Sequence, residues 1–489
     1  MDAHHFPRLN PGGPGTRPSV TVAKPEVYQA SGIAMPTRIS PEEVRFHPHS
    51  FADPHGRVFR WRGHLLRALT PEGAARFDRV QKDGLLGELM ARGLLIETTA
   101  TSFHMPGYAR VVRHRELPFV SYPQEWCPAM FKRAVVAIVD LAVTAARHGL
   151  ALKDAHPWNV VFDGTAPVYV DVGSIAPCQD PGAWPGRDEF DRYCLYPLLL
   201  MSRGYEHLAR RMLPTETGVT AEDIRHFGWD GCVEAASAGR MAQARYLTKI
   251  AQRLWRVLGT RTRRTPTLLE ELTELREVVA ALPLPGPDGF AAFSRRACPA
   301  PAPEVLTRRV QALRQVVASH QPNTLLVVGG SGLADVALPP LCPGGVVVLS
   351  PDPGHVTRLY EQVEAARAPV HPVMMDVANP TPSMGWGSYW SIAACERLRC
   401  EMVVAVDLVD ELVLRRHFSL AQIVEGLSAY ASRWLVVEWI EPAPDAGEAV
   451  PRPVWLTRDE FLRALRREFR QVRDFSRESG STTVIVCER

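Results

Sequence analysis

The sequence predicts a two-domain chain, in which an α+β unit is followed by an α/β unit with a mostly parallel sheet. A length of 489 residues exceeds the about 100–200 residues of an ordinary domain. A Pro-rich interval at 286–304 separates two parts of different patterning. Short strands and then long helical patterns precede it, whereas strands and helices alternate regularly after it. We therefore expect a disordered tail at 1–40 and domains at 41–285 and 305–489.

The composition favours a folded protein that acts on small molecules. Hydrophobic residues make up 46% of the chain, and 56 basic side chains nearly balance 53 acidic ones, leaving a net charge of +3. This balance argues against nucleic acid or a membrane as the main partner. The nine cysteines form no zinc-like cluster, and neither a signal peptide nor a membrane span is recognisable, so we expect a cytoplasmic protein with reduced thiols.

The elements of the first unit follow from local patterns. Two alternating runs at 56–69 flank Arg62-Gly63 and predict a hairpin. Apolar residues at helical spacing over 131–149 predict a helix that ends at Gly149. The stretch from 150 to 174 reads as loop, strand, turn, strand and loop, and amphipathic helices follow over 188–280. This part therefore forms a small sheet with a larger helical region behind it.

Seven strand candidates follow the Pro-rich interval. The first five are joined by apolar helices, which favours parallel strands covered on both faces. The last two are joined by RESGS and predict an antiparallel hairpin. This count and order predict a Rossmann-like, seven-stranded sheet of the class I methyltransferase type. The strands are TLLVVG, GVVVLS, VHPVMMD, EMVVAVD, RWLVVEW, FRQVRDF and TTVIVCE.

The first unit carries a constellation suited to phosphoryl transfer, which needs a carboxylate near the acceptor and an amide and carboxylate on magnesium. Asp154 precedes Asn159 by five positions, and Asp171 follows a short strand. These residues, with His156, resemble the catalytic loop of protein kinases, and more closely that of aminoglycoside phosphotransferases and choline kinases. The resemblance implies a kinase-like fold that binds ATP and Mg²⁺. It makes Asp154 the catalytic carboxylate and Asn159 and Asp171 the metal ligands.

The nucleotide clamp of a kinase is altered in this sequence. No G-x-G-x-x-G loop occurs, and the early strands contain no Lys to hold the phosphates. Arg67, on the second strand of the hairpin, is the basic residue at a suitable place, with Glu88 as a candidate helical partner. Arg67 could equally be a solvated strand residue, so both interpretations stay open.

The second unit resembles class I methyltransferases in its strand ends, and the resemblance implies a candidate site for S-adenosylmethionine (SAM). Gly329, Gly330, Ser331 and Gly332 follow its first strand, where a Gly-rich turn lets the backbone approach a cofactor. Val327, two positions before the first glycine of this turn, stands where class I methyltransferases usually have an acidic residue.

The other candidate contacts of SAM follow the later strands of this unit. Ser350 stands where class I methyltransferases have the carboxylate that binds the ribose of SAM, and Asp352 lies two residues later. Asp376 is the candidate contact of the adenine. Asp407 and Asp410 follow the fourth strand and are candidates to orient the acceptor. Each of these acidic residues could also be a helix cap or a solvated rim residue.

Taken together, the two units resemble bacterial class I SAM-dependent methyltransferases, related to nodulation-type enzymes, that carry a kinase-like N-terminal region. The segments that carry this resemblance are VFRWRGHLLRAL, LPFVSYPQEW, GLALKDAHPWNVVFDGTAPVYVDVGS, PVMMDVANPTPSMGW and RWLVVEWIEP. The resemblance implies methyl transfer from SAM to a small molecule or glycoconjugate, and a place in specialised metabolism. Two alternatives remain. The chain could be an ATP- and Mg²⁺-dependent small-molecule phosphotransferase with a degenerate methyltransferase domain, or it could be a non-catalytic scaffold.

Overall fold

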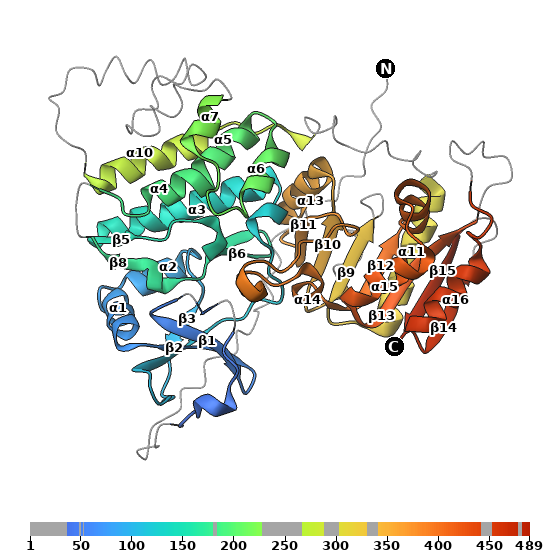
Figure 1. The fold of residues 1–489 in the computed structure, drawn as a ribbon, viewed down its shortest axis with the longest axis horizontal. Helices are drawn as coiled ribbons and strands as arrows, with labels where there is room; N and C mark the ends of the chain where they lie inside the picture. Colours follow the sequence, from blue (N-terminus) through green and yellow to red (C-terminus); the bar gives the residue numbers. More distant parts are fainter. Residues whose placement is uncertain are drawn as a thin grey trace, which may run out of the picture.

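The structure is a computed structural model that describes residues 37–489, except for 48–49, 52, 179–182, 227–266, 288–302, 330–340, 442–451 and 478–481. It contains an N-terminal unit up to residue 287 and a C-terminal unit from residue 303, which lie side by side (Figure 1). Residues 1–36 of the expected tail, most of the expected linker and residues 227–266 of the expected helical region lie outside the described residues, whereas Ile39 of the expected tail is buried in the N-terminal unit.

The N-terminal unit begins with a four-stranded antiparallel sheet in the order β1-β2-β4-β3. The expected hairpin is confirmed, because Trp61 pairs with His64 across a turn in which Arg62 and Gly63 have φ of 48° and 76°. The sheet and its two helices are β1 (Gly56–Trp61), β2 (His64–Leu69), α1 (Pro71–Lys82), α2 (Leu85–Ala91), β3 (Thr98–Ala100) and β4 (Arg110–His114).

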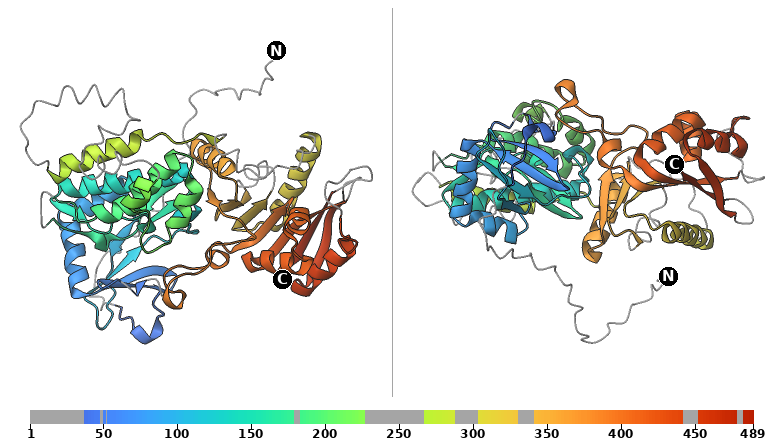
Figure 2. Two further views of the ribbon diagram at one scale, coloured as in Figure 1. Left: turned by 45° about the horizontal axis from the view of Figure 1, so that its top comes forward. Right: turned by 90° about the horizontal axis from the view of Figure 1, so that it is seen from below.

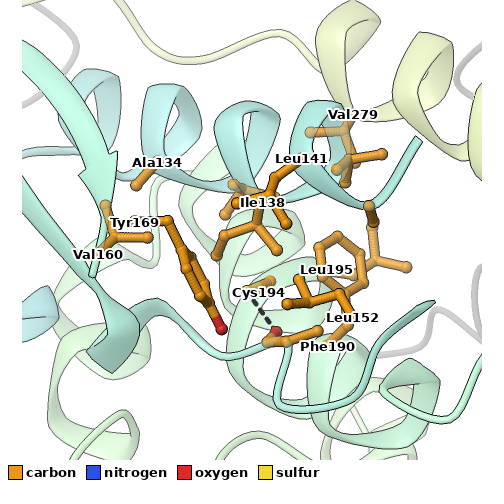
Figure 3. Close-up of a cluster of buried hydrophobic side chains, with 14 of the residues drawn as sticks. Ala134, Ile138, Leu141, Leu152, Val160, Tyr169, Phe190, Cys194, Leu195 and Val279 are labelled. Atoms are coloured by element: carbon orange, nitrogen blue, oxygen red, sulfur yellow. Dashed lines mark hydrogen bonds between the residues drawn. The ribbon is translucent and has the colours of Figure 1, made fainter. Parts of the chain in front are cut away.

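A helical region built around one long helix follows the sheet. Helix α3 (Pro128–Arg147) is confirmed close to its expected bounds, and Gly149 just beyond it has a φ of 69°. Figure 3 shows side chains of α3 packed against Tyr169 and the helix that contains Cys194. The remaining elements are β5 (Leu150–Leu152), β6 (Val160–Asp163), β7 (Ala166–Tyr169), β8 (Ile175–Pro177), α4 (Arg187–Phe190), the π-helical turn Asp191–Leu195, α5 (Tyr196–Ser202), α6 (Glu206–Met212), α7 (Ala221–His226) and α10 (Leu268–Ala281).

The C-terminal unit is built on a seven-stranded sheet in the order β11-β10-β9-β12-β13-β15-β14. Strands β9 to β13 are parallel and the last two are antiparallel, as the sequence predicted. The elements are α11 (Pro303–His320), β9 (Leu325–Gly329), β10 (Val346–Ser350), α13 (Pro353–Ala366), β11 (Val370–Met374), α14 (Ala394–Arg397), β12 (Cys400–Val406), the π-helical turn Glu411–Arg415, α15 (Leu420–Tyr430), β13 (Ala431–Ile440), α16 (Arg458–Glu468), β14 (Gln471–Arg477) and β15 (Thr482–Glu488).

Both faces of this sheet are buried. Leu325 and Val327 of β9 pack on the side of α11 and α13, while Leu326 and Val328 pack on the side of α15 and α16. Successive side chains of a strand point to opposite faces, so a strand covered on both faces needs an unbroken apolar run. This explains why the apolar runs predicted these strands.

Helix α13 joins the two units. Its Leu359 and Val363 belong to the core beneath the sheet, whereas Val356 and Tyr360 belong to the core around α3. The Tyr360 hydroxyl also donates a hydrogen bond to the carbonyl of Thr165 at 3.0 Å. One helix thus has two apolar faces, and the units share a continuous core.

A buried ion pair adds to this interface. Arg397 and Glu125 form the pair, and their side chains are only 5% and 1% exposed. The guanidinium of Arg397 donates to the carbonyls of Ile392 and Val120 at 2.9 and 2.6 Å. It also lies over the ring of Tyr122, 4.0 Å from its centroid. Because this guanidinium bonds to both units, we expect them to behave as one rigid body.

Candidate functional site

The carboxyl edge of the seven-stranded sheet is the candidate cofactor site. The chain proceeds from β9 to β10 and β11 on one side, then crosses to β12 on the other side of β9. Such a reversal opens a crevice at the carboxyl ends of the two central strands, which is where ligands of open α/β sheets bind. Here the crevice lies between Gly329, which ends β9, and Asp407, which directly follows β12.

Gly329 is required by the backbone at this crevice. Its φ is 76°, and a Cβ built there would lie 2.2 Å from the carbonyl oxygen of Val406. A side chain would therefore both strain the turn and collide with the neighbouring strand. The close approach of the two backbones fits the sequence prediction of a cofactor turn. The other three predicted residues of the turn, Gly330, Ser331 and Gly332, lie outside the described residues.

Ser350 and Asp352 shape the turn after β10. The Ser350 hydroxyl accepts a hydrogen bond from the amide of Asp352 at 3.2 Å. Oδ1 of Asp352 accepts from the amides of Gly354 and His355 at 2.8 and 3.1 Å, so Asp352 is the N-cap of α13. The helix cap that the sequence left open as an alternative is thus present, and ribose binding by Asp352 stays a prediction.

Three predicted carboxylates at this edge are each paired with an arginine. Arg416 donates to Oδ2 of Asp376 at 2.7 Å. Arg452 donates to both oxygens of Asp410, at 3.1 and 2.8 Å. A guanidinium fixes the orientation of the carboxylate that it holds, so these groups are suited to positioning a ligand.

Asp407 is held by an arginine from the helix that precedes the sheet. Arg309 of α11, whose side chain is 6% exposed, donates to Oδ1 of Asp407 at 2.5 Å and also pairs with the buried Glu438 of β13. Asp407 itself has a φ of 53°, a left-handed conformation that non-glycine residues seldom adopt. Such strained residues cluster at functional sites, which supports a role for Asp407 beside the cofactor crevice.

The three residues predicted to act in phosphoryl transfer lie close together in the N-terminal unit. The Asn159 amide donates to the hydroxyl of Tyr169 at 3.0 Å and to the carbonyl of Asp154 at 3.4 Å. Asp154 lies 3.6 Å from the ammonium of Lys153, and burial raises its pKa above the usual range. Asp171 follows β7 and its Oδ1 accepts from the amide of Gly173.

Arg67 is not a solvated strand residue, because only 6% of it is exposed. It lies buried on β2 and forms ion pairs with Asp171, at 2.8 Å, and with Asp53. The expected pairing with Glu88 is wrong, because Glu88 pairs with His148 at 2.9 Å. Asp53 was missed because it lies in a segment without a motif, upstream of β1. With a guanidinium already on Asp171, the side chains as they stand do not fit a magnesium ion.

Glu189 is a further titratable residue in the N-terminal unit that the sequence motifs missed. Burial and the nearby Asp154 raise its pKa to about 7. The imidazole of His156 lies 4.0 Å from it, and burial lowers the pKa of that imidazole to about 4. The raised pKa of Glu189 is what marks it as a candidate functional residue. Because this pKa depends on burial in the folded chain, no sequence motif indicated the residue.

The segment between β11 and α14 reaches toward the N-terminal unit (Figure 2), and two pairs of aromatic side chains join it to that unit. The rings of Trp158 and Trp390 lie 4.4 Å apart, and those of Phe51 and Tyr389 lie 6.2 Å apart. Trp386 is 92% exposed, which is unusual for so large an apolar surface. We call the two pairs, together with Trp386 of the same segment, the aromatic cluster; its members are Phe51, Trp158, Trp386, Tyr389 and Trp390.

Other features bear on the expected class of protein. A cavity of about 340 Å³ lies between the units, but it is lined by Gly345 and Val370 at the amino ends of β10 and β11, away from the crevice. Within the described part of the chain, no helix is long and apolar enough to cross a membrane, and no cluster of three metal-ligating side chains occurs. All seven cysteines in the described ranges are free.

Comparisons with known proteins point to one bacterial relative over most of the chain. No family model matches. The chain is 24% identical over 443 residues to nodulation protein NoeA of Rhizobium meliloti (strain 1021), covering 82% of this chain and 86% of that protein. It is thus similar to a nodulation protein along almost its whole length.

Solved structures of methyltransferases are also similar. NodS, an N-methyltransferase from Bradyrhizobium japonicum WM9, is 13% identical with a TM-score of 0.28, covering 38% of this chain and 97% of that one. The magnesium protoporphyrin IX methyltransferase ChlM from Synechocystis PCC 6803, solved with bound SAM, is 11% identical with a TM-score of 0.27. It covers 41% of this chain and 91% of that one.

Proposed function

We propose that this chain is a SAM-dependent methyltransferase whose C-terminal unit holds the cofactor at the crevice between β9 and β12. The observation that carries the proposal is the turn at Gly329, where a Cβ would lie 2.2 Å from the carbonyl oxygen of Val406, at the point where the strand order of the sheet reverses. SAM would supply an electrophilic methyl group. The contribution of the protein is then chiefly alignment of donor and acceptor, which requires no free base.

The predicted residues take distinct roles in this proposal. Gly329 to Gly332 would contact the methionine part of SAM. Asp376 would contact the adenine and Ser350 or Asp352 the ribose, while Asp407 and Asp410 would position the acceptor. Their arginine partners support positioning, since each guanidinium fixes a carboxylate in one orientation. The free cysteines in the described ranges support a cytoplasmic location.

Calorimetric titration of the full-length chain with SAM tests this proposal. We expect saturable binding with one site per chain. The product S-adenosylhomocysteine should compete for it, whereas ATP with Mg²⁺ should not. Absence of any heat and of any shift in the thermal unfolding midpoint with SAM would contradict the proposal and favour the scaffold hypothesis. The full chain is needed because the units share a core through α13.

The acceptor in this proposal is a glycoconjugate that stacks on the aromatic cluster. In this cluster, Trp386, Tyr389 and Trp390 follow Asp376 in the chain, so their segment begins at the same carboxyl edge as the cofactor crevice. The exposed faces of Trp386 and Tyr389 present flat apolar surfaces, which suit the apolar faces of sugar rings. The N-terminal unit, which we propose to be kinase-like in fold, contributes Trp158 and Phe51 to this surface.

Replacing Trp386 with alanine is expected to weaken acceptor binding by about tenfold, as loss of an exposed aromatic contact does. A panel of soluble oligosaccharides, titrated against the full chain, provides the ligands. Trp455→Ala is the matched control, because Trp455 is 48% exposed and lies outside the aromatic cluster. Equal binding by the two variants, or no binding of any oligosaccharide by the unaltered chain, would remove the aromatic cluster from the acceptor site.

A further inference from the structure

Arg67 occupies the place where a kinase-like catalytic loop would hold its divalent cation. Its Nη1 donates to Oδ1 of Asp171 at 2.8 Å, and its Nη2 donates to Oδ2 of Asp53. The side chain of Arg67 is 8% exposed, and those of the two carboxylates are each 22% exposed. One guanidinium therefore neutralises half of the negative charge of the two carboxylates that would attract a metal ion to this place.

The fold holds this guanidinium in place from several sides. Arg67 lies in the middle of β2, paired with Val58 of β1 and Val112 of β4. A Cβ on Gly56 would lie 2.9 Å from its Nε, and one on Gly173 would lie 3.5 Å from its Nη2. The surroundings are thus shaped to the arginine, and the guanidinium has little freedom to leave Asp171.

Charges around the guanidinium are arranged to favour its cationic form. Burial alone would lower the pKa of Arg67, but Asp171 and Asp53 raise it above its ordinary value. His114 lies nearby and is kept neutral, because burial and the charge of Arg67 together lower the pKa of its imidazole to about 3. Lys153 is the other cation acting on Asp171, and it lies beside Asp154. The site therefore contains one fixed cation between two carboxylates.

The neighbouring polar groups are hydrogen-bonded to one another. The Asn159 amide nitrogen donates to the hydroxyl of Tyr169, and that hydroxyl donates to the carbonyl of Asp154 at 2.6 Å. Oδ1 of Asp171 accepts from both Arg67 and the amide of Gly173. Magnesium demands near-octahedral coordination by oxygen, and it would have to displace a cation that is already bonded to the carboxylate.

We propose that Arg67 is a built-in substitute for the divalent cation, so that the N-terminal unit binds no Mg²⁺ at Asp171 and performs no magnesium-dependent phosphoryl transfer. In its place, the guanidinium fastens the four-stranded sheet to the segment that follows β7. The proposal is independent of methyl transfer, since it concerns only the N-terminal unit. It also explains why the three predicted residues of the catalytic loop are kept close together without a fitting metal site.

Titration with Mn²⁺, followed by the electron paramagnetic resonance signal of the free ion, tests the proposal on the full-length chain. The unaltered protein should bind no Mn²⁺ below about 1 mM, a range in which protein carboxylate sites commonly bind divalent ions. Arg67→Met removes the cation and leaves Asp53 and Asp171 facing each other, so this variant should bind one Mn²⁺ at least about tenfold more tightly than the unaltered protein. Arg67→Lys keeps the charge and should bind none.

Controls separate this site from adventitious binding. Arg60→Met removes an exposed arginine of β1 and should leave Mn²⁺ binding unchanged. Asp171→Asn combined with Arg67→Met should abolish the new site. If Arg67→Met folds only with metal, its thermal midpoint should rise with Mg²⁺. Stoichiometric Mn²⁺ binding by the unaltered chain that Asp171→Asn abolishes, or equal binding by Arg67→Met and Arg67→Lys, would overturn the proposal.

Discussion

Replacing Arg397 with methionine is expected to destabilise both units together, lowering the free energy of unfolding by about 3–5 kcal/mol, as breaking a buried ion pair does. The substitution leaves the Glu125 carboxylate, 1% exposed, without its counter-charge. It also removes the donors to the carbonyls of Ile392 and Val120. Chemical denaturation followed by far-UV circular dichroism and by tryptophan fluorescence measures this loss.

A double variant and a surface control make the expected result specific. Arg397→Met combined with Glu125→Gln removes the uncompensated charge and should recover part of the lost stability. Arg60→Met breaks a pair whose side chains are 63% and 40% exposed, and should lower the free energy of unfolding by less than about 1 kcal/mol. A variant Arg397→Met as stable as Arg60→Met would show that the ion pair does not hold the units together.

The shared core makes a single unfolding transition the expected behaviour. Met374 of β11 and Tyr360 of α13 pack in the same cluster as α3 of the N-terminal unit. Arg210 adds two hydrogen bonds of 2.6 Å, to the carbonyls of Gln124 and Met374. Separating the units in the Pro-rich interval would expose this apolar surface to water, so the separated parts are poor substitutes for the whole chain.

Elements were predictable from sequence where one local pattern decides them. The turn at Arg62 and Gly63, the helix that ends before Gly149 and the apolar runs of the seven-stranded sheet each need only neighbouring residues to specify them. The double role of α13 was also present in its sequence, as two apolar pairs four residues apart. Whether an apolar pair of α13 packs against the sheet or against the N-terminal unit depends on tertiary packing. The sequence pattern of α13 therefore did not indicate the interface between the units.

The partners of the candidate site residues were not predictable in this way. Arg309 lies in α11, 98 positions before Asp407, and Arg67 lies 104 positions before Asp171. Spacing motifs report residues that one short segment brings together, whereas an ion pair between distant segments depends on the complete fold. The acidic residues were therefore identifiable as candidates, but their engagement by arginines became visible only in three dimensions.

Gly329→Ala is expected to weaken SAM binding by at least about 100-fold, since the new Cβ blocks a backbone approach that a bound cofactor requires. The Cβ would lie 2.2 Å from the carbonyl oxygen of Val406, so the turn after β9 has to move away from β12. The φ of 76° adds strain of about 1–2 kcal/mol for a non-glycine residue. Calorimetry gives the affinity, and the thermal midpoint gives the accompanying loss of stability.

Gly426→Ala provides the matched control for this substitution. Gly426 lies in α15, and a Cβ there would meet nothing within 4 Å, so the change should leave SAM binding intact and slightly stabilise the helix. A loss of binding by Gly329→Ala with circular dichroism unchanged would locate the cofactor at the crevice. If both variants bind SAM equally, the cofactor lies elsewhere. The close approach of β9 and β12 would then be a requirement of the sheet alone.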